Sequence, residues 1–510
     1  MAGEARAGSA SVGGAGNDLA GRLERLTTAQ RALLTRRLAQ RASPGPCRPS
    51  ATQFGIWLFE QLNPGTSTYH NPAAVRLSGP VDEDLLREAL QRIQDRHEPL
   101  RSRYPADEEG VPRAFVEPPH ALRLPWRVED VSALPDPGQE ATRIVAQEAV
   151  TPFRLDRGPV WRCLLVRTGP EERVLVITLH HIVSDGGSLG VLLAELGVLY
   201  PALAAGERPS PVTLPQGYFA LAAKDTVPPG ALEHWLTTLD GAPDRIDLSA
   251  LAEWPGRGEP PRPPAPGGGF APTGPARQSG PTQGAAVGRQ WAGRELTLQV
   301  PEDTAKALEG LCARHGSSLF TGLVAASAAT LYRTSGQEDL VLTTPVDRRG
   351  HEGRALIGCF VNTVVLRLRV GPDDRMDTLL ARAAEVVADA LAHSGLPFSR
   401  LVSALPRRGG GRSPLGNVAV VQNNAPMDAV SLGGLRLSVH PLPPVEVKHD
   451  LALSWNRGHD GLTGRIEYAT RFPDAAVERL CGHLRHTVET LAAAPATRVA
   501  DLPGLSEVAR

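Results

Sequence analysis

The sequence is poor in cysteine and contains no long uncharged apolar run. Its five cysteines are scattered, odd in number and without a CxxC pair, which argues against a disulfide framework and a cysteine-based zinc site and favours a reducing, cytoplasmic location. The first twenty residues are rich in Gly and Ala and lack the apolar core of a secretory signal. No stretch approaches the roughly 18–20 apolar residues that cross a bilayer, so we expect no membrane partner.

The chain also lacks an excess of charge of either sign. Its 54 basic and 55 acidic residues give a formal net charge of −1, so bulk electrostatics provides no attraction to nucleic acid. What the sequence does have is length and apolar content. At 510 residues, of which 41% are hydrophobic, it is long enough for two or three domains with sizeable cores.

Changes in composition and periodicity divide the chain into segments. Residues 1–17 are predicted to be disordered, and leucines at near-helical spacing predict a helical segment over 18–43 that either packs on its own domain or docks a partner chain. Strand-like and helical runs alternate over 48–225 and again over 226–510, which predicts two α/β lobes. The Pro- and Gly-rich stretch at about 253–290 interrupts the second lobe and is predicted to be a disordered insertion.

Hydrophobic periodicity predicts particular elements within both lobes. Short apolar runs are typical of buried strands, whereas apolar residues that recur every three or four positions are typical of helices. The predicted strands are 73–79, 162–169, 172–181, 294–300 and 339–346, and the predicted helices are 82–97 and 317–333.

The stretch TLHHIVSDGGSLG, residues 178–190, has the most chemical interest. An apolar run predicts a buried strand that ends at two histidines, and leucines predict a helix from about Leu189. An imidazole can accept a proton from a nucleophile or orient it, and Asp185 can hold a ring, cap the helix or pair with a distant cation. Gly186 and Gly187 permit a sharp turn, and free helix-start amides can face an oxyanion. These residues alone leave a catalytic loop and a structural turn equally open.

Several motifs in a fixed order resemble a known family. The loop reads HHIVSDG, which matches the pattern HHxxxDG; SATQFGIW, RHEPLRSRY and IGCFVNTVVLR resemble SxAQxRLW, RHExLRTxF and IGxFVNTxxxR. The later segments LPFSRLV, RSPLGNV, HDLALSW and GLTGRIEY also follow the family's order. Over about residues 50–505 the chain therefore resembles the condensation domains of nonribosomal peptide synthetases, members of the chloramphenicol-acetyltransferase-like superfamily.

This resemblance implies a fold and an activity. The fold would be two chloramphenicol-acetyltransferase-like α/β lobes in a V-shaped pseudo-dimer with a central tunnel. The activity would be acyl transfer, in which an acyl or aminoacyl group passes from the phosphopantetheine thioester of a donor carrier protein to an amine and forms an amide. The resemblance implies no bound cofactor and no metal, because the phosphopantetheine belongs to the partner carrier proteins.

The resemblance also assigns roles within the loop, position by position. His181 is expected to be catalytic, as a base or as a group that orients the amine. Gly186 is expected to offer its amide to the developing oxyanion. His180 and Asp185 are expected to hold the loop in place.

The second lobe is expected to complete this site. The resemblance pairs Asp185 with an arginine of the family's GxPxxxR segment, which here is TTPVDRRG, so Arg349 is the first choice and Arg348 the alternative. A buried carboxylate without such a partner would be costly. Gly187, Ser188 and Asn362 are expected at the tunnel. A bulkier residue is usual at the position of Gly187, so the small side chain predicts extra space for a substrate.

Two further functions remain open at this stage. The same site could form an ester with a hydroxyl acceptor, which requires a stronger general base, or the chain could be a noncatalytic recruitment module. The sequence shows neither an adenylation core nor a carrier serine motif. We therefore expect a free-standing monomer that works in trans on a donor carrier protein and, in some cases, an acceptor carrier protein.

Overall fold

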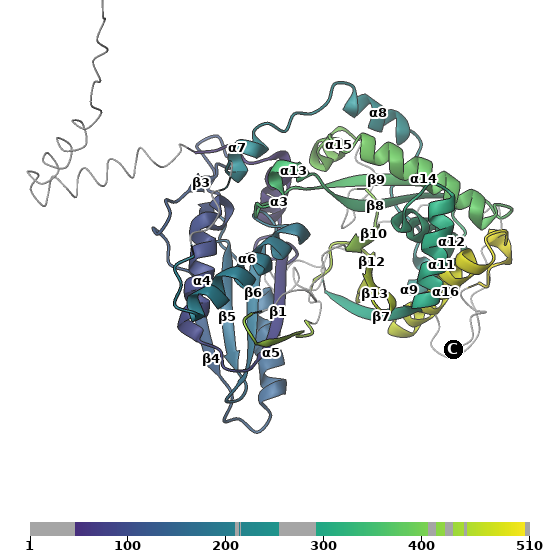
Figure 1. Ribbon diagram of the computed structural model, residues 1–510. Coiled ribbons are helices and arrows are strands. Elements are labelled where there is room, and N and C mark those ends of the chain that lie inside the picture. Colours follow the sequence, from purple (N-terminus) through teal and green to yellow (C-terminus); the bar gives the residue numbers. More distant parts are fainter. Residues whose placement is uncertain are drawn as a thin grey trace, which may run out of the picture.

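The structure is a computed structural model that describes residues 46–209, 214, 216–253, 292–405, 415–423, 432–442 and 446–504. The predicted disordered start, the helical segment 18–43 and nearly all of the insertion at 253–290 lie outside these residues. The described chain forms two α/β lobes that lie side by side and are joined near the top of Figure 1. The predicted fold class is confirmed.

The N-terminal lobe is built on a five-stranded sheet in the order β11-β1-β6-β5-β4. Helices α4 and α6 cover one face, where they pack on alternate residues of β6 such as Ile177. Helix α5 covers the other face, where Val176 meets Val145. The elements are α3 (Ala51–Leu62), β1 (His70–Ser78), α4 (Glu83–Arg96), β4 (Trp126–Asp130), α5 (Pro137–Val150), β5 (Trp161–Arg167), β6 (Glu172–His180) and α6 (Gly186–Ala204).

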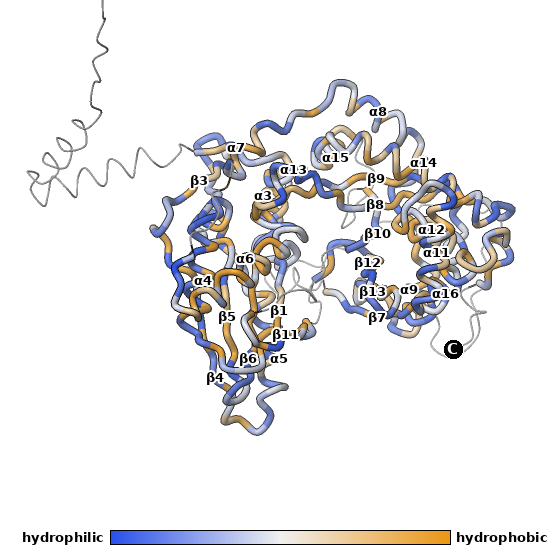
Figure 2. The backbone as a smooth tube through the Cα atoms, viewed as in Figure 1, coloured by the Kyte–Doolittle hydropathy of each residue, from blue (hydrophilic) through white to orange (hydrophobic). Residues whose placement is uncertain are grey.

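The C-terminal lobe has a six-stranded sheet in the order β7-β13-β12-β10-β8-β9. Its main helices pack together on the side away from the N-terminal lobe, and Figure 2 shows apolar segments gathered between sheet and helices. The strands are β7 (Gly293–Pro301), β8 (Asp339–Asp347), β9 (Val361–Arg369), β10 (Val418–Asn423), β12 (Leu451–Gly458) and β13 (Gly461–Ala469). The main helices are α11 (Glu302–Arg314), α12 (Leu319–Ser335), α14 (Met376–Ala392) and α16 (Asp474–Ala493).

The two lobes repeat one topology. In the first, β1 is antiparallel to β6, β6 is antiparallel to β5, and β5 is parallel to β4. In the second, β7 is antiparallel to β13, β13 is antiparallel to β12, and β12 is parallel to β10. A helix follows β1 and β6 in one lobe and β7 and β13 in the other. The turn after β6 therefore corresponds to the turn after β13.

One segment crosses the predicted boundary between the lobes. Strand β11 (Arg436–Val439) belongs to the range 226–510 but pairs antiparallel with β1 in the N-terminal sheet. An edge strand leaves backbone N–H and C=O groups unpaired, and β11 satisfies these groups along β1. The two lobes therefore do not divide strictly at residue 225, because one strand from the second half of the chain completes the sheet of the first lobe.

The predicted elements are present, with small shifts at their ends. The predicted helix 82–97 is α4, whose N-cap Asp82 accepts hydrogen bonds from the amides of Asp84 and Leu85. The helix expected from about Leu189 begins three residues earlier, at Gly186. This earlier start is explained by Asp185 and Ser188, which form a capping box that the leucine spacing does not reveal.

Helix α6 is long and apolar enough to cross a membrane by length and composition, whereas the sequence analysis found no such stretch. Within the described structure one face of α6 packs into the N-terminal core through Leu192 and Leu196. Its single acid, Glu195, contacts Arg96 and His97 of the neighbouring helix end. These contacts are those of a core helix within a lobe. A core helix can meet the same length and composition criteria as a membrane-spanning helix.

Candidate active site

The two histidines lie where β6 ends and α6 begins. His180 is the last residue of β6, and its backbone N–H donates to the Val160 carbonyl at 2.9 Å. The backbone N–H of His181 donates to the Tyr69 carbonyl, just before β1, at 2.8 Å. The turn is thus held by the strands on both sides, which fixes the direction in which each imidazole leaves the backbone.

Asp185 caps α6 and binds the other lobe at the same time. Its Oδ1 accepts hydrogen bonds from the Ser188 amide at 2.9 Å and the Ser188 hydroxyl at 2.8 Å. Its Oδ2 accepts from the Phe360 amide of the C-terminal lobe at 2.9 Å. Burial raises the pKa of Asp185, whereas Arg349 and the backbone donors oppose that rise. The carboxylate is therefore balanced by an ion pair rather than left as an isolated buried charge.

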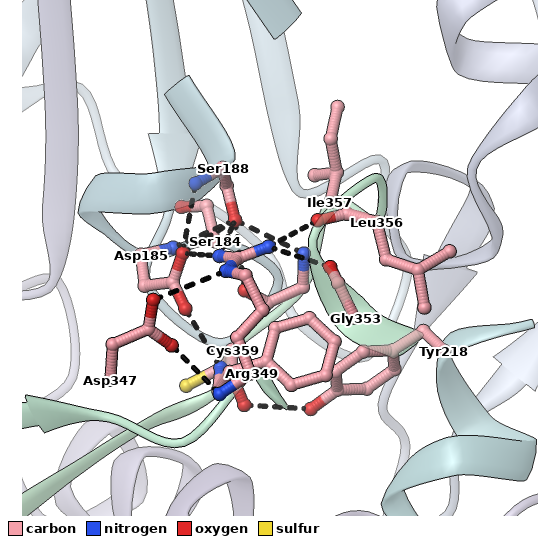
Figure 3. Close-up of polar contacts among 12 residues, drawn as sticks. Ser184, Asp185, Ser188, Tyr218, Asp347, Arg349, Gly353, Leu356, Ile357 and Cys359 are labelled. Atoms are coloured by element: carbon pink, nitrogen blue, oxygen red, sulfur yellow. Dashed lines mark hydrogen bonds and ion pairs between the residues drawn. The ribbon is translucent and has the colours of Figure 1, made fainter. Parts of the chain in front are cut away.

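The ion pair between Arg349 and Asp185 joins the lobes and confirms the predicted pairing. Arg349 is 7% exposed, also donates to the carbonyls of Gly353 and Leu356, and stacks over the Phe360 ring at 4.6 Å. Figure 3 shows Arg349 at the centre of this polar network. The alternative partner, Arg348, instead pairs with Asp225 at 2.9 Å.

The two glycines of the loop have different surroundings from those predicted. Neither Gly186 nor Gly187 has a positive φ, so the turn does not require their conformational freedom. A Cβ at Gly187 would lie 2.8 Å from Nη2 of Arg349, whereas a Cβ at Gly186 would meet nothing within 4 Å. The missing side chain at Gly187 therefore makes room for the Arg349 guanidinium, and the predicted extra space for a substrate is not there in this direction.

His180 is fully buried and forms a neutral pair with Glu60 of α3. Its Nδ1 accepts the Ile182 amide at 3.1 Å, which leaves the proton of the neutral ring on Nε2, 3.2 Å from Oε1 of Glu60. Burial lowers the pKa of His180 to about 3, and burial together with Glu446 raises the pKa of Glu60 to about 8. Both groups are uncharged at pH 7, so the pair holds the loop without a buried charge.

His181 is half-buried and differs from its neighbour in its contacts. No side chain in the described part of the chain hydrogen-bonds to its ring nitrogens. Its Nδ1 is enclosed, and the backbone of His181 and Ser184 lies near the ring. Burial, followed by the nearby Lys448 ammonium, holds the pKa of His181 well below its usual range. The imidazole is therefore neutral, and Nε2, the ring nitrogen that is not enclosed, is the candidate acceptor.

Sequence reasoning missed two neighbours of His181. The Tyr69 ring meets the His181 ring edge to face at 6.0 Å, and Nζ of Lys448 lies 4.7 Å from the centre of the Tyr69 ring. Burial lowers the pKa of Lys448 to about 8. Lys448 directly precedes the segment HDLALSW, but nothing in its spacing shows that it reaches a residue almost four hundred positions earlier.

Of the remaining predicted residues, Ser188 contacts the other lobe and Asn362 binds within its own. Ser188 is fully buried, and its hydroxyl lies 2.9 Å from the Gly358 carbonyl. The Asn362 amide donates to the carbonyls of Ser394 and Leu396, and Asn362 lines a cavity of about 380 Å³ that also includes Arg348. The residues that line this cavity do not include His181. The tunnel role of Gly187, Ser188 and Asn362 remains a prediction, as does the oxyanion role of Gly186.

The comparison with protein families gives one assignment for nearly the whole chain. The family model described as the condensation domain matches residues 48–256 and 275–510. Phosphinothricin tripeptide synthetase PhsC of Streptomyces viridochromogenes is 34% identical over 515 aligned residues, covering 96% of this chain and 44% of the synthetase. Chondramide synthase of Chondromyces crocatus is 32% identical over 461 aligned residues, covering 89% of this chain and 11% of the synthase. The chain thus spans less than half the length of these relatives.

Solved structures agree with this assignment at the level of the fold. The X-domain from teicoplanin biosynthesis matches with a TM-score of 0.73 and 24% identity, over 90% of this chain and 98% of the X-domain. The first condensation domain of the calcium-dependent antibiotic synthetase, in complex with a substrate analogue, matches with a TM-score of 0.71 and 23% identity. The match covers 90% of this chain and 98% of that domain. The chain therefore belongs to the condensation domain family, the acyltransferases of nonribosomal peptide synthetases.

Proposed function

We propose that the chain forms an amide bond by transferring an acyl or aminoacyl group from the phosphopantetheine thioester of a donor carrier protein to an amine. The observation that carries this proposal is the state of His181. Its imidazole is neutral and half-buried, and it lies beside the start of α6, where the Asp185–Arg349 ion pair joins the lobes. The donor carrier and a carrier-bound acceptor would bind in trans.

The chemistry requires one proton relay. The amine nitrogen bonds to the thioester carbon, the carbonyl oxygen takes the negative charge, and a proton of the now cationic nitrogen passes to Nε2 of His181. The intermediate collapses, the carbon–sulfur bond breaks, and the thiolate takes the proton back from His181. The products are an amide and a free thiol, and His181 ends in its starting state.

The loop offers stabilisation for the oxyanion. The first amides of a helix have no intrahelical acceptor, and the helix dipole is positive there. Asp185 accepts the Ser188 amide, so the Gly186 amide is our candidate donor. Gly186 is exposed, and a Cβ at this position would meet nothing within 4 Å, which leaves space for a reacting group beside it.

The lowered pKa of His181 favours an amine over a hydroxyl acceptor. A weak base suffices to remove a proton from the cationic nitrogen of the intermediate, whereas a hydroxyl must lose its proton as it attacks. One of the relatives described above is also a tripeptide synthetase by name. Both points support amide formation over ester formation.

A direct assay tests this proposal. The chain is incubated with a donor carrier protein loaded with an acyl or aminoacyl group and with a matched pair of acceptors, one an amine and one the corresponding alcohol. Mass spectrometry should detect the amide product and release of the donor thiol, with little ester. Ester as the main product, or release of free acid alone, would contradict the proposal.

A further inference from the structure

A cluster of three possible metal ligands lies outside the candidate active site, where the chain that links the lobes reaches the C-terminal lobe. His234 is on α8 (Ala231–Thr238), and Asp389 and His393 lie one helical turn apart at the end of α14. One donor atom from each residue lies within 4.8 Å of the other two. The sequence analysis expected no metal. The cluster shows no spacing motif, since His234 and Asp389 are 155 positions apart.

The distances match those of a metal site. Nε2 of His234 lies 3.0 Å from Oδ2 of Asp389, and Nδ1 of His393 lies 3.2 Å from Oδ1 of Asp389. Two ligands that are each about 2.0–2.1 Å from a tetrahedral zinc ion lie roughly 3.3 Å apart. The imidazole rings are stacked, with centroids 3.5 Å apart and an interplanar angle of 11°. Because a metal ion lies in the plane of each imidazole that binds it, one ring must rotate about its Cβ–Cγ bond before both rings and the carboxylate reach one cation.

The helices that carry these ligands are held together independently of any metal. Trp235, next to His234, is 3% exposed, and its Nε1 donates to the His393 carbonyl at 3.1 Å. Figure 1 shows α8 beside the helices of the C-terminal lobe, at the end of the connection from α7 (Tyr218–Ala222). The two helices that carry the side chains are thus placed before any ion binds, which lowers the entropic cost of binding.

We infer that His234, Asp389 and His393 bind one divalent transition-metal ion of the zinc class. Two imidazoles and a carboxylate suit Zn²⁺, Co²⁺, Ni²⁺ or Cu²⁺, whereas Mg²⁺ and Ca²⁺ prefer oxygen ligands. The side chains are 25%, 45% and 35% exposed, respectively, so solvent completes the coordination. The bound ion cross-links α8 to α14 and thereby fixes the point at which the linker between the lobes joins the C-terminal lobe.

Binding competes with hydrogen bonds that the cluster makes without metal. Nδ1 of His393 is 2.9 Å from the Asp389 carbonyl, and Nε2 of His234 is 3.5 Å from the Thr238 hydroxyl. Each imidazole nitrogen must leave these partners before it ligates a metal ion.

The experiment uses the untagged full chain and titrates it with Co²⁺, whose ligand-field absorbance reports nitrogen coordination, and with Zn²⁺ by calorimetry. We expect one ion per chain and a higher melting temperature. Loss of an outer-shell partner costs about 10–100-fold in metal affinity, so Asp389→Asn and His393→Ala should each cost more than about 100-fold. His315→Ala, an exposed histidine at the end of α11, should bind like wild type.

Three results would overturn the inference: no saturable 1:1 binding, equal affinity in Asp389→Asn and wild type, or an equal loss in His315→Ala. Metal-free circular dichroism melts show whether each variant folds. If His393→Ala fails to fold, Asp389→Asn decides the question, because it keeps the side-chain volume and removes only the charged ligand.

Discussion

The turn after β6 and the turn after β13 occupy the same place in two copies of one topology. Each follows an antiparallel hairpin, and each opens a long helix. One backbone hydrogen bond recurs in both: the His181 N–H donates to the Tyr69 carbonyl at 2.8 Å, and the Thr470 N–H donates to the Ala292 carbonyl at 3.2 Å. Thr470 therefore stands where the first lobe has His181.

The side chains of the two turns differ in where they find partners. Asp185 in the first turn is 5% exposed and pairs with Arg349 of the other lobe. Asp474, at the second turn, is 47% exposed and pairs with Arg294 of its own lobe at 2.6 Å. The second turn also contributes Arg471, which is 46% exposed and pairs with the buried Asp450 of its own lobe. The repeated topology supplies the backbone of a turn twice, but only the first turn has an ion pair that is buried on both sides and joins the lobes, with a neutral imidazole beside it.

Replacement of His181 and Thr470, which occupy equivalent positions, should give the largest difference in transfer rate. His181→Ala removes the proposed proton acceptor, and general acid–base groups contribute about 10²–10⁴-fold to rate. We expect transfer from a loaded carrier, followed by mass spectrometry, to slow by that factor. Thr470→Ala is the matched control and should keep the wild-type rate. Wild-type transfer by His181→Ala would remove His181 from the mechanism.

Removal of the arginine from each turn should separate a buried pair from an exposed one. Arg349→Met leaves the Asp185 carboxylate buried without a counter-charge, and such a change costs about 3–5 kcal/mol of unfolding free energy. Arg294→Met breaks an exposed pair worth about 0–1 kcal/mol. Urea denaturation measures both. Adding Asp185→Asn to Arg349→Met should recover part of the loss; equal losses in the two single variants would refute the distinction.

Two glycines of α6 should respond to alanine in opposite directions. A Cβ at Gly187 would displace the Arg349 guanidinium, and overpacking costs about 1–3 kcal/mol. A Cβ at Gly190 would meet nothing within 4 Å, so Gly190→Ala should gain up to about 1 kcal/mol from helix propensity. Thermal and urea denaturation measure the signs. A neutral or stabilising Gly187→Ala would show that Arg349 can move aside without loss.

The lobes also contain glutamates with opposite pH dependence. Glu60 has a folded pKa raised to about 8 from 4.5, so its contribution to stability is fully present below pH 4.5 and is lost as the pH rises through 8. Glu302, paired with Arg457, has its pKa lowered to about 2 from 4.5, so its contribution is present above pH 4.5 and is lost as the pH falls through 2. Glu60→Gln should flatten the alkaline loss, and Glu302→Gln the acid loss, in denaturation profiles. If Glu60→Gln changes the acid loss instead, or Glu302→Gln the alkaline loss, these pKa shifts are contradicted.

The smallest expected effect concerns Lys448. Its ammonium is one cause of the low pKa of His181, so Lys448→Met should shift that pKa upward, as seen by NMR titration of the ring and in the acid limb of the transfer rate. Lys306→Met, which removes an exposed lysine of α11 that pairs with Glu302, should leave both unchanged. A downward shift would mean that Lys448 does not act on His181 through its charge.

Local patterns predicted much of this molecule. The apolar run before the histidines and the leucine spacing after them placed a strand and a helix around the loop, because burial on one face imposes a period on the sequence. The ordered motifs identified the family and the Asp185–Arg349 pair. The early start of α6 was missed because a cap depends on side-chain geometry. The sequence also did not show that Arg349 of the other lobe fills the space on one side of Gly187.

By itself the sequence determined the two α/β lobes, their strands and helices, and the loop that contains His180 and His181. Only the tertiary structure decided that His180 pairs with Glu60 while His181 has no side-chain hydrogen bond within the described residues, that Lys448 lies near the site, and that β11 crosses between lobes. The physical reason is that period and propensity act between near neighbours along the chain. The pKa of a histidine and the ligands of an ion depend on groups that only folding brings together.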